Sequence, residues 1–259
     1  MTFLQTPPLF PLSSISRLVS ASPADRVDAT SDAGPADAAN QLRLARQAEG
    51  ARYALLRRLA PAIRHDMAGA LQPISMVAAM LEKRLQNPAP DLAAMAKNVH
   101  AVNALTREAS LSCMQLMNWL SPKVGEATPV HTGIAEAIAL VTTDLSFKGF
   151  TLVNQTDAAD TTAAVRVNVL RGLFMAALLT MADSHSGSAR MLLGADVQNN
   201  KLILSITLEP SEDEAMIAMP PSYRSLDWDD VQALAAAESA VLVRAHCRVE
   251  LHCVLGALG

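Results

Sequence analysis

The sequence is poor in the residues that build several kinds of protein. Aromatic residues are 3% of the 259-residue chain. The three cysteines, Cys113, Cys247 and Cys253, form neither an even disulfide set nor a zinc-ligand spacing. Positive charge is not in excess, since the formal net charge is −4. We therefore expect buried thiols in a reducing, cytoplasmic compartment, no metal site, and no nucleic-acid binding driven by a strong positive field.

Long hydrophobic runs are also lacking. No uninterrupted apolar stretch reaches the roughly 18 residues that a membrane span needs. The first residues are apolar but are interrupted by Pro7, Pro8 and Pro11, and no lysine or arginine precedes them as in a signal peptide. Residues 20–40 consist mostly of Ala, Ser, Asp, Pro and Gly without apolar periodicity. We expect residues 1–38 to be disordered and the chain to be soluble, with no membrane partner.

Two stretches of the sequence have the apolar periodicity of long helices. Apolar residues recur mostly at steps of three, four and seven from Leu42 to Leu81, and again from Leu92 to Leu120. Prolines at 88, 90 and 122 end the stretches. We predict an antiparallel helical hairpin within residues 39–124. Because one hairpin leaves half of each apolar stripe in water, we expect a homodimer in which two hairpins form a four-helix bundle.

One histidine, His65, lies in the middle of the first of these predicted helices. Residues 64–74 read Arg-His-Asp-Met-Ala-Gly-Ala-Leu-Gln-Pro-Ile. Pro61 and Pro73 each remove a backbone donor on either side of His65, and Gly69 weakens the same turns, so a bend or a local break is expected. Histidine alone is often just a polar residue on a solvated helix face.

Residues 125–259 alternate between helical and strand patterns. Helices are expected at 131–147, 168–183 and 228–244, and strands at 150–153, 191–197, 201–208 and 248–255. The whole chain therefore has the pattern of an α+β protein, in which the hairpin is followed by an α/β sandwich with a mixed, largely antiparallel sheet.

His65-Asp66, followed by Leu71 and Ile74, resembles the H-box of two-component histidine kinases and histidine phosphotransferases. The order of hairpin, turn with proline, second helix and α/β module extends the resemblance over residues 41–259. It implies that His65 accepts a phosphoryl group and that the Asp66 carboxylate orients the ring. Arg64, Gly69 and Gln72 would then form an open partner-binding face. Arg57 and Arg58 either meet an acidic partner pocket or are solvated helix charges.

The sequence departs from this family at several positions. Gly69 and Ala70 stand where Thr or Asn and Pro are common, which puts phosphatase activity in doubt. Ala176 and Thr180 align with the asparagines that hold magnesium and phosphates in the family. The family's glycine-rich nucleotide loop is replaced by the acidic residues 209–214, and no glycine occurs between Gly194 and Gly256. These changes predict a degenerate ATPase-like domain over residues 125–259, with no bound cofactor.

The favoured function is a histidine phosphotransferase that relays a phosphoryl group between receiver-domain aspartates through His65, without autonomous ATP-dependent kinase activity. Its expected partners are response regulator receiver domains and an upstream hybrid histidine kinase, and the receiver would supply Mg²⁺. Two alternatives remain open. One is an unorthodox histidine kinase with a divergent ATP site, and the other is a non-catalytic dimeric pseudokinase scaffold that binds a response regulator.

Overall fold

The computed structural model describes residues 35–120, 125–156, 163–199, 201–211 and 224–256. Most of the segment expected to be disordered, 1–38, lies outside these residues. Its last four residues instead begin helix α1 (Pro35–Leu85). Proline is well placed there, because its missing N–H is one that the first helical turn leaves unpaired in any case.

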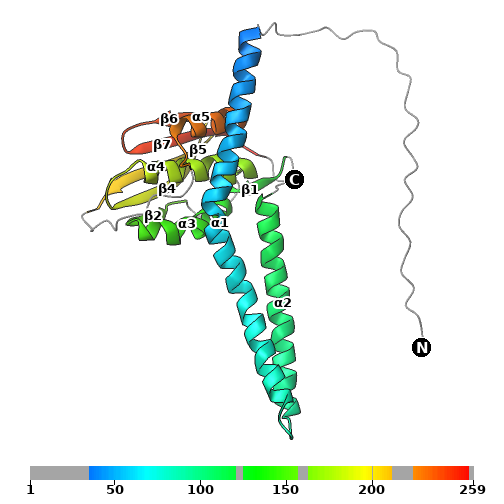
Figure 1. Ribbon diagram of the computed structural model, residues 1–259. Helices are drawn as coiled ribbons and strands as arrows, with labels where there is room; N and C mark the ends of the chain where they lie inside the picture. The colour runs from blue at the N-terminus through cyan, green and yellow to red at the C-terminus, as the bar shows by residue number, and fades with distance from the viewer. Residues whose placement is uncertain (1–34, 121–124, 157–162, 200, 212–223, 257–259) are drawn as a thin grey trace, which may run out of the picture.

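The hairpin consists of α1 and α2 (Leu92–Leu120), which are 51 and 29 residues long. Asp91 starts α2, since its Oδ1 accepts hydrogen bonds from the backbone N–H groups of Ala93 and Ala94. Helix α1 is continuous through Pro61 and Pro73. Of the two outcomes expected at these prolines, Figure 1 shows a change of direction, where α1 passes the α/β domain, and no break.

The remaining elements form the α/β domain. In chain order they are β1 (Ala127–Pro129), α3 (Val130–Phe147), β2 (Phe150–Asn154), β3 (Ala164–Arg166), a π-helical segment η1 (Val169–Phe174), α4 (Met175–Asp183), β4 (Ala189–Gln198), β5 (Lys201–Pro210), α5 (Trp228–Ala237), β6 (Val241–Arg244) and β7 (Arg248–Val254). The five-stranded sheet has the order β2-β4-β5-β7-β6, and β1 pairs with β3 in a separate two-stranded sheet. The β2–β4 pair is parallel, and the other three pairs of the large sheet are antiparallel. The expected α+β fold with a mixed sheet is therefore confirmed.

One predicted helix was too long. The helix expected at 228–244 ends at Ala237, and Val241–Arg244 form β6 instead. Ser239 adopts a positive φ of 54°, which turns the chain back, and Val241 and Val243 favour a strand that pairs with β7. The short strands β1 and β3 were also missed, since three-residue pairs leave no periodic signal.

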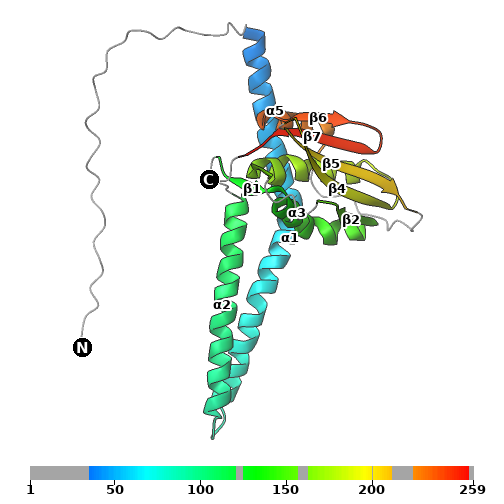
Figure 2. The same ribbon diagram turned by 180° about the vertical axis from the view of Figure 1, so that it is seen from behind.

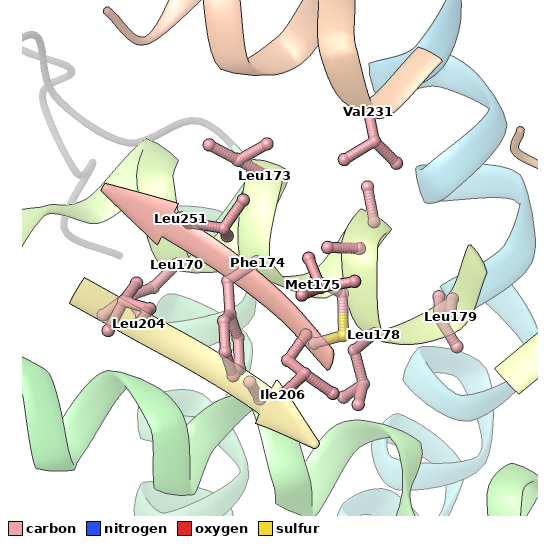
Figure 3. Packing of buried hydrophobic residues seen from close by; sticks show 14 of the residues in the cluster. Leu170, Leu173, Phe174, Met175, Leu178, Leu179, Leu204, Ile206, Val231 and Leu251 are labelled. Carbon is pink, nitrogen blue, oxygen red and sulfur yellow. The ribbon is translucent and has the colours of Figure 1, made fainter. Parts of the chain in front are cut away.

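The core of the domain lies between the large sheet and the helices α3, η1, α4 and α5. Figure 3 shows Phe174 of η1 and Met175 and Leu178 of α4 on the side of this helical stretch that faces Ile206 of β5. These four residues are at most 1% exposed. Because α4 is buried on its other side as well, nearly every residue from Val169 to Ala182 is shielded from water.

Helix α1 is shared between the domain and the hairpin. Its N-terminal half crosses the domain beside α5, and its C-terminal half runs along α2 (Figures 1 and 2). Ala48, Ala51, Leu55 and Leu59 are at most 3% exposed and belong to the domain core. The single apolar stripe expected along α1 thus serves two different surfaces. Its members Met67 and Leu71, in the hairpin half, are 37% and 46% exposed.

Two groups of ion pairs fasten α1 to the domain. Arg52 Nη2 lies 3.2 Å from Glu238 Oε1, and Arg166 pairs with the same carboxylate, which is 6% exposed. Lower on the helix, Arg58 Nη2 lies 2.7 Å from Asp144 Oδ2 of α3. No helix in the described part of the chain combines the length and apolar character needed to cross a membrane.

Candidate functional site

His65 lies on α1 just beyond the point where the helix leaves the domain, and its side chain is 88% exposed. Helix geometry explains this position. The helix face that packs on the domain carries Leu55 and Leu59, and His65 falls on a different side of the helix. The imidazole is therefore presented to solvent on a rigid element.

Asp66 is the nearest polar partner of the ring. Its Oδ1 lies 3.4 Å from His65 Nδ1, and its side chain is 59% exposed. When Nδ1 carries the ring proton, it can donate to this carboxylate, and Nε2 then keeps a free lone pair. A neutral imidazole in this tautomer is a competent nucleophile, and the carboxylate can stabilise the positive charge that develops on the ring.

The surroundings of His65 on α1 are open. Arg64, Gly69 and Gln72 are all exposed. A Cβ atom built on Gly69 would meet no atom within 4 Å. Because Gly69 has no side chain, the helix surface one turn from His65 is open, and no other described part of the chain covers it.

The two arginines above the site have different roles. Arg57 is exposed, and its Nη1 donates to the Tyr53 hydroxyl over 3.5 Å. Arg58 points into the protein: its side chain is 11% exposed, and its Nη2 also reaches Asp183 Oδ1 at 3.5 Å. Both alternatives considered for Arg58, a partner contact and a solvated charge, are therefore wrong. Its role is to pair with carboxylates of α3 and α4.

The hairpin below His65 exposes an unusual number of large apolar side chains. On α1 these are Met67, Leu71, Met76, Met80 and Leu85, and on α2 they are Leu92, Val99, Leu111, Met114 and Met117, which are between 37% and 73% exposed. An exposed apolar surface of this extent is typical of a protein–protein interface. Self-association through the hairpin would cover it.

Among the described residues, the helix where the family resemblance would place a nucleotide is closely packed. Ala176 and Thr180 of α4, which align with the family's asparagines, are 0% and 1% exposed. The hollow between α1, α3 and α4 is lined by Arg58, Pro61 and their neighbours and has a volume of about 70 Å³. Pockets for cofactors usually measure roughly 300–1,000 Å³.

The start of α5 is occupied by acidic groups of the chain itself. Asp227 Oδ1 accepts a hydrogen bond of 2.9 Å from the Asp230 N–H, and Asp230 Oδ2 accepts one of 3.2 Å from the Asp227 N–H. Arg224 forms two hydrogen bonds with Asp230, at 2.6 Å and 3.2 Å. The hydrogen bond to Asp230 is the main reason why the pKa of Arg224 is raised. A helix start that could attract phosphate is therefore capped by carboxylates.

Cysteines and histidines form no second site in the described residues. Cys113, Cys247 and Cys253 are free thiols, and of the burial expected for all three only that of Cys253 is found, because Cys113 and Cys247 are half-buried. Within the described ranges no cluster of three or more His, Cys, Asp or Glu side chains is arranged to hold a metal ion. His252 instead bonds to Glu250 on β7 over 3.0 Å, and this bond is the main cause of a lowered Glu250 pKa.

Sequence reasoning missed the attachment of α1 to the domain. One signal was available: the alanines at 48, 51 and 54 recur at a helical spacing, and such small residues allow two helices to approach closely. The main partner of this face, α5, follows more than 100 residues later. Periodicity within α1 therefore indicated a buried face without indicating what covers it.

The fold is similar to several solved histidine kinases. The histidine kinase AdeS of Acinetobacter baumannii is 12% identical, with a TM-score of 0.41, over 71% of this chain and 98% of that one. A histidine kinase from Burkholderia phymatum is 15% identical, with a TM-score of 0.40, over 77% and 99%.

The histidine kinase ThkA, solved in complex with the response regulator protein TrrA, is 12% identical, with a TM-score of 0.40, over 85% of this chain and 66% of that one. No protein-family model and no curated protein matches the sequence. At these identities and TM-scores the likeness assigns neither a family nor an activity.

Proposed function

We propose that this chain is a histidine phosphotransferase, in which His65 takes a phosphoryl group from the aspartyl phosphate of one receiver domain and passes it to the aspartate of another. The observation that carries the proposal is the His65 ring, which is 88% exposed beside Asp66 on an open helix face. Partner proteins can reach such a group, whereas a histidine with a packing role is normally covered.

The transfer needs only what the site offers. His65 Nε2 attacks the phosphorus atom, the bond from phosphorus to the aspartyl oxygen breaks, and the carboxylate leaves. Asp66 holds the ring through Nδ1 and balances the charge of the phosphorylated imidazole. In the second half-reaction an aspartate oxygen attacks the same phosphorus and Nε2 leaves. Magnesium would come with the receiver, where carboxylates bind it, so this chain needs no cofactor of its own.

Three further elements belong to the proposal. The chain acts as a homodimer, which would cover the exposed apolar side chains of the hairpin. An upstream hybrid histidine kinase supplies the first receiver. The reaction takes place in the cytoplasm, a location that suits three free cysteines.

The kinase alternative receives less support from the geometry. A kinase domain must bring bound ATP to the histidine, yet here the N-terminal half of α1 is buried against the domain and joined to it by the Glu238 and Asp144 ion pairs. The carboxylates of Asp227 and Asp230 at the start of α5 would also repel a triphosphate. We propose that the α/β domain binds no nucleotide and serves as a fixed body beside His65.

Labelling with radioactive phosphate tests the proposal. The pure chain is incubated with labelled ATP, and separately with receiver domains from the same genome that carry a labelled aspartyl phosphate. We expect no label from ATP and acid-labile label from at least one receiver. His65→Ala should abolish the label, and His100→Ala, which removes an exposed histidine from α2, should not.

Two further results make the test decisive. Asp66→Asn should slow transfer by about 10- to 100-fold, by analogy with carboxylates that orient metal-binding histidines. Replacing an exposed helical histidine changes stability by only about 0.5 kcal/mol, so unfolding would not explain a loss of transfer. Label on His65→Ala at the wild-type level would refute the proposal and favour the scaffold, and label from ATP alone would favour the kinase.

A further inference from the structure

A row of arginines follows the face of α1 that points away from the domain. Residues 40–64 contain six arginines and one acidic residue, Glu49, although the whole chain has a net charge of −4. Arg52 and Arg58 are engaged by carboxylates of the domain. The other four, Arg43, Arg46, Arg57 and Arg64, are all exposed, and we refer to them as the arginine stripe.

Helical spacing aligns three of the four residues of the stripe, and Arg43 lies about 60° to one side of Arg46. Arg46, Arg57 and Arg64 are separated by 11 and 7 residues, so at about 100° per residue they deviate by only about 20° from a straight line along the helix. The buried residues Ala51 and Leu55 lie on the opposite side. From Arg46 to Arg64 the stripe is about 27 Å long, at 1.5 Å per residue.

The charges of the stripe are mostly not neutralised within the chain. Among the described residues, no carboxylate lies within ion-pair distance of Arg43, Arg46 or Arg64. Arg43 bonds only to the neutral side chains of Asn40 and Gln47, at 3.1 Å and 3.4 Å. Glu49 is paired with Arg52 at 3.5 Å. Arg43, Arg46 and Arg64 therefore keep their positive charge at the two ends of the stripe, and the end with Arg64 lies beside His65.

We propose that the arginine stripe is a docking surface for the acidic face of the receiver domain that exchanges phosphate with His65. This inference rests on the proposed function and extends it by about 27 Å along α1. An aspartyl phosphate and the carboxylates that bind its magnesium make the partner's surface negative around the reacting group. A protein that brings this group to His65 can lay its neighbouring surface on the stripe.

Other occupants fit less well. A second copy of the chain would place like charges against each other, which is repulsive. Nucleic acid or an anionic membrane would meet a molecule of net charge −4, whose long-range field does not favour approach. Between Arg46 and Arg57 the stripe face carries Gly50 and Tyr53 and no large aliphatic side chain that would enter a bilayer.

Charge reversal far from His65 tests the inference. Arg43 and Arg46 are 22 and 19 residues from His65, which is about 30 Å along the helix. In Arg43→Glu/Arg46→Glu we expect the KM for a labelled receiver domain to rise about 5- to 20-fold at 50 mM salt, with kcat unchanged. The difference should largely disappear at 0.5 M salt, where charges are screened within a few ångströms.

A matched control has the same charge change at a similar distance on the other side of His65. Lys83→Glu/Arg84→Glu alters residues 18 and 19 positions away, in the last turn of α1. It should leave both KM and kcat near the wild-type values. Circular dichroism of all variants checks that the helices remain folded.

Binding without transfer separates this inference from the proposed function. Receiver domains without phosphate are bound to immobilised His65→Ala protein with and without the Arg43→Glu/Arg46→Glu change. Weaker binding after charge reversal supports the stripe even if no transfer to His65 is ever seen. Three results would overturn the inference. They are unchanged binding or KM after charge reversal of the stripe, an equal loss of binding in the Lys83→Glu/Arg84→Glu control, and no binding of any receiver domain at 50 mM salt. Tighter, stripe-dependent binding of a 20-base-pair DNA or of vesicles that contain phosphatidylserine would also overturn it.

Discussion

Replacing Leu55 by alanine should destabilise the protein far more than the same change at Leu42, although both residues lie on α1. Leu55 is 3% exposed and packs in the domain core, whereas Leu42 is 52% exposed. Helix propensity changes equally at the two positions, so the difference measures packing alone. The pair therefore tests whether the N-terminal half of α1 is truly part of the domain.

The magnitude follows from what surrounds the side chain. Truncating a buried leucine to alanine lowers the free energy of unfolding by roughly 2–5 kcal/mol, and the loss is largest where neighbouring side chains cannot move into the space. On the N-terminal side of Leu55 the buried residues of the same α1 face are Ala48 and Ala51, whose short side chains cannot reach into the space. We expect a loss of about 3–5 kcal/mol for Leu55→Ala and about 0.5 kcal/mol or less for Leu42→Ala.

Guanidinium unfolding followed by two probes gives the answer. Far-ultraviolet circular dichroism is dominated by the long helices, and the fluorescence of Trp228, whose ring lies 4.3 Å from the Arg244 guanidinium carbon, reports on α5 and β6. A Trp119→Phe background isolates that signal. In Leu55→Ala the fluorescence midpoint should fall with, or ahead of, the dichroism midpoint. Equal midpoints for Leu55→Ala and Leu42→Ala would refute the packing of α1 on the domain, and with it the argument that the domain is fixed beside His65.

Two other predictions address association and thiol chemistry. Light scattering at micromolar concentration should give twice the 27.5 kDa chain mass for the wild type. Leu71→Lys should give the monomer mass, whereas Val241→Lys, on the sheet edge, should not. A monomeric wild type would refute the four-helix bundle. Burial raises the pKa of Cys253 to about 12 from 9.0, so in the folded protein it should react with a disulfide reagent at pH 8 much more slowly than Cys113 and Cys247. Because the unfolded chain loses this proton first, stability should fall between about pH 9 and pH 12 more steeply in the wild type than in Cys253→Ala; parallel curves would contradict the burial of the thiol.

Local pattern alone was sufficient for much of the fold. The periodicity of α1 and α2, the prolines between them and the alternation of β4 and β5 predicted these elements close to their observed bounds, because each depends on interactions within a few residues. His65 was proposed as the phosphoryl acceptor in the same way, from its neighbours in sequence. Its exposure followed from the helix pattern and needed no knowledge of the rest of the chain.

Tertiary structure decided what each face of these elements meets. Arg57 and Arg58 are adjacent and chemically identical, yet Arg57 is exposed, whereas Arg58 points into the protein and pairs with carboxylates of α3 and α4 more than 80 residues away. Leu55 and Leu71 belong to one apolar stripe of the sequence, but their environments differ, since they are 3% and 46% exposed. A helical period specifies that one side of α1 is apolar, but whether a domain, a second helix or water covers it depends on where distant parts of the chain fold back. That is why the site residue was visible in the sequence, and the fixed domain beside it was not.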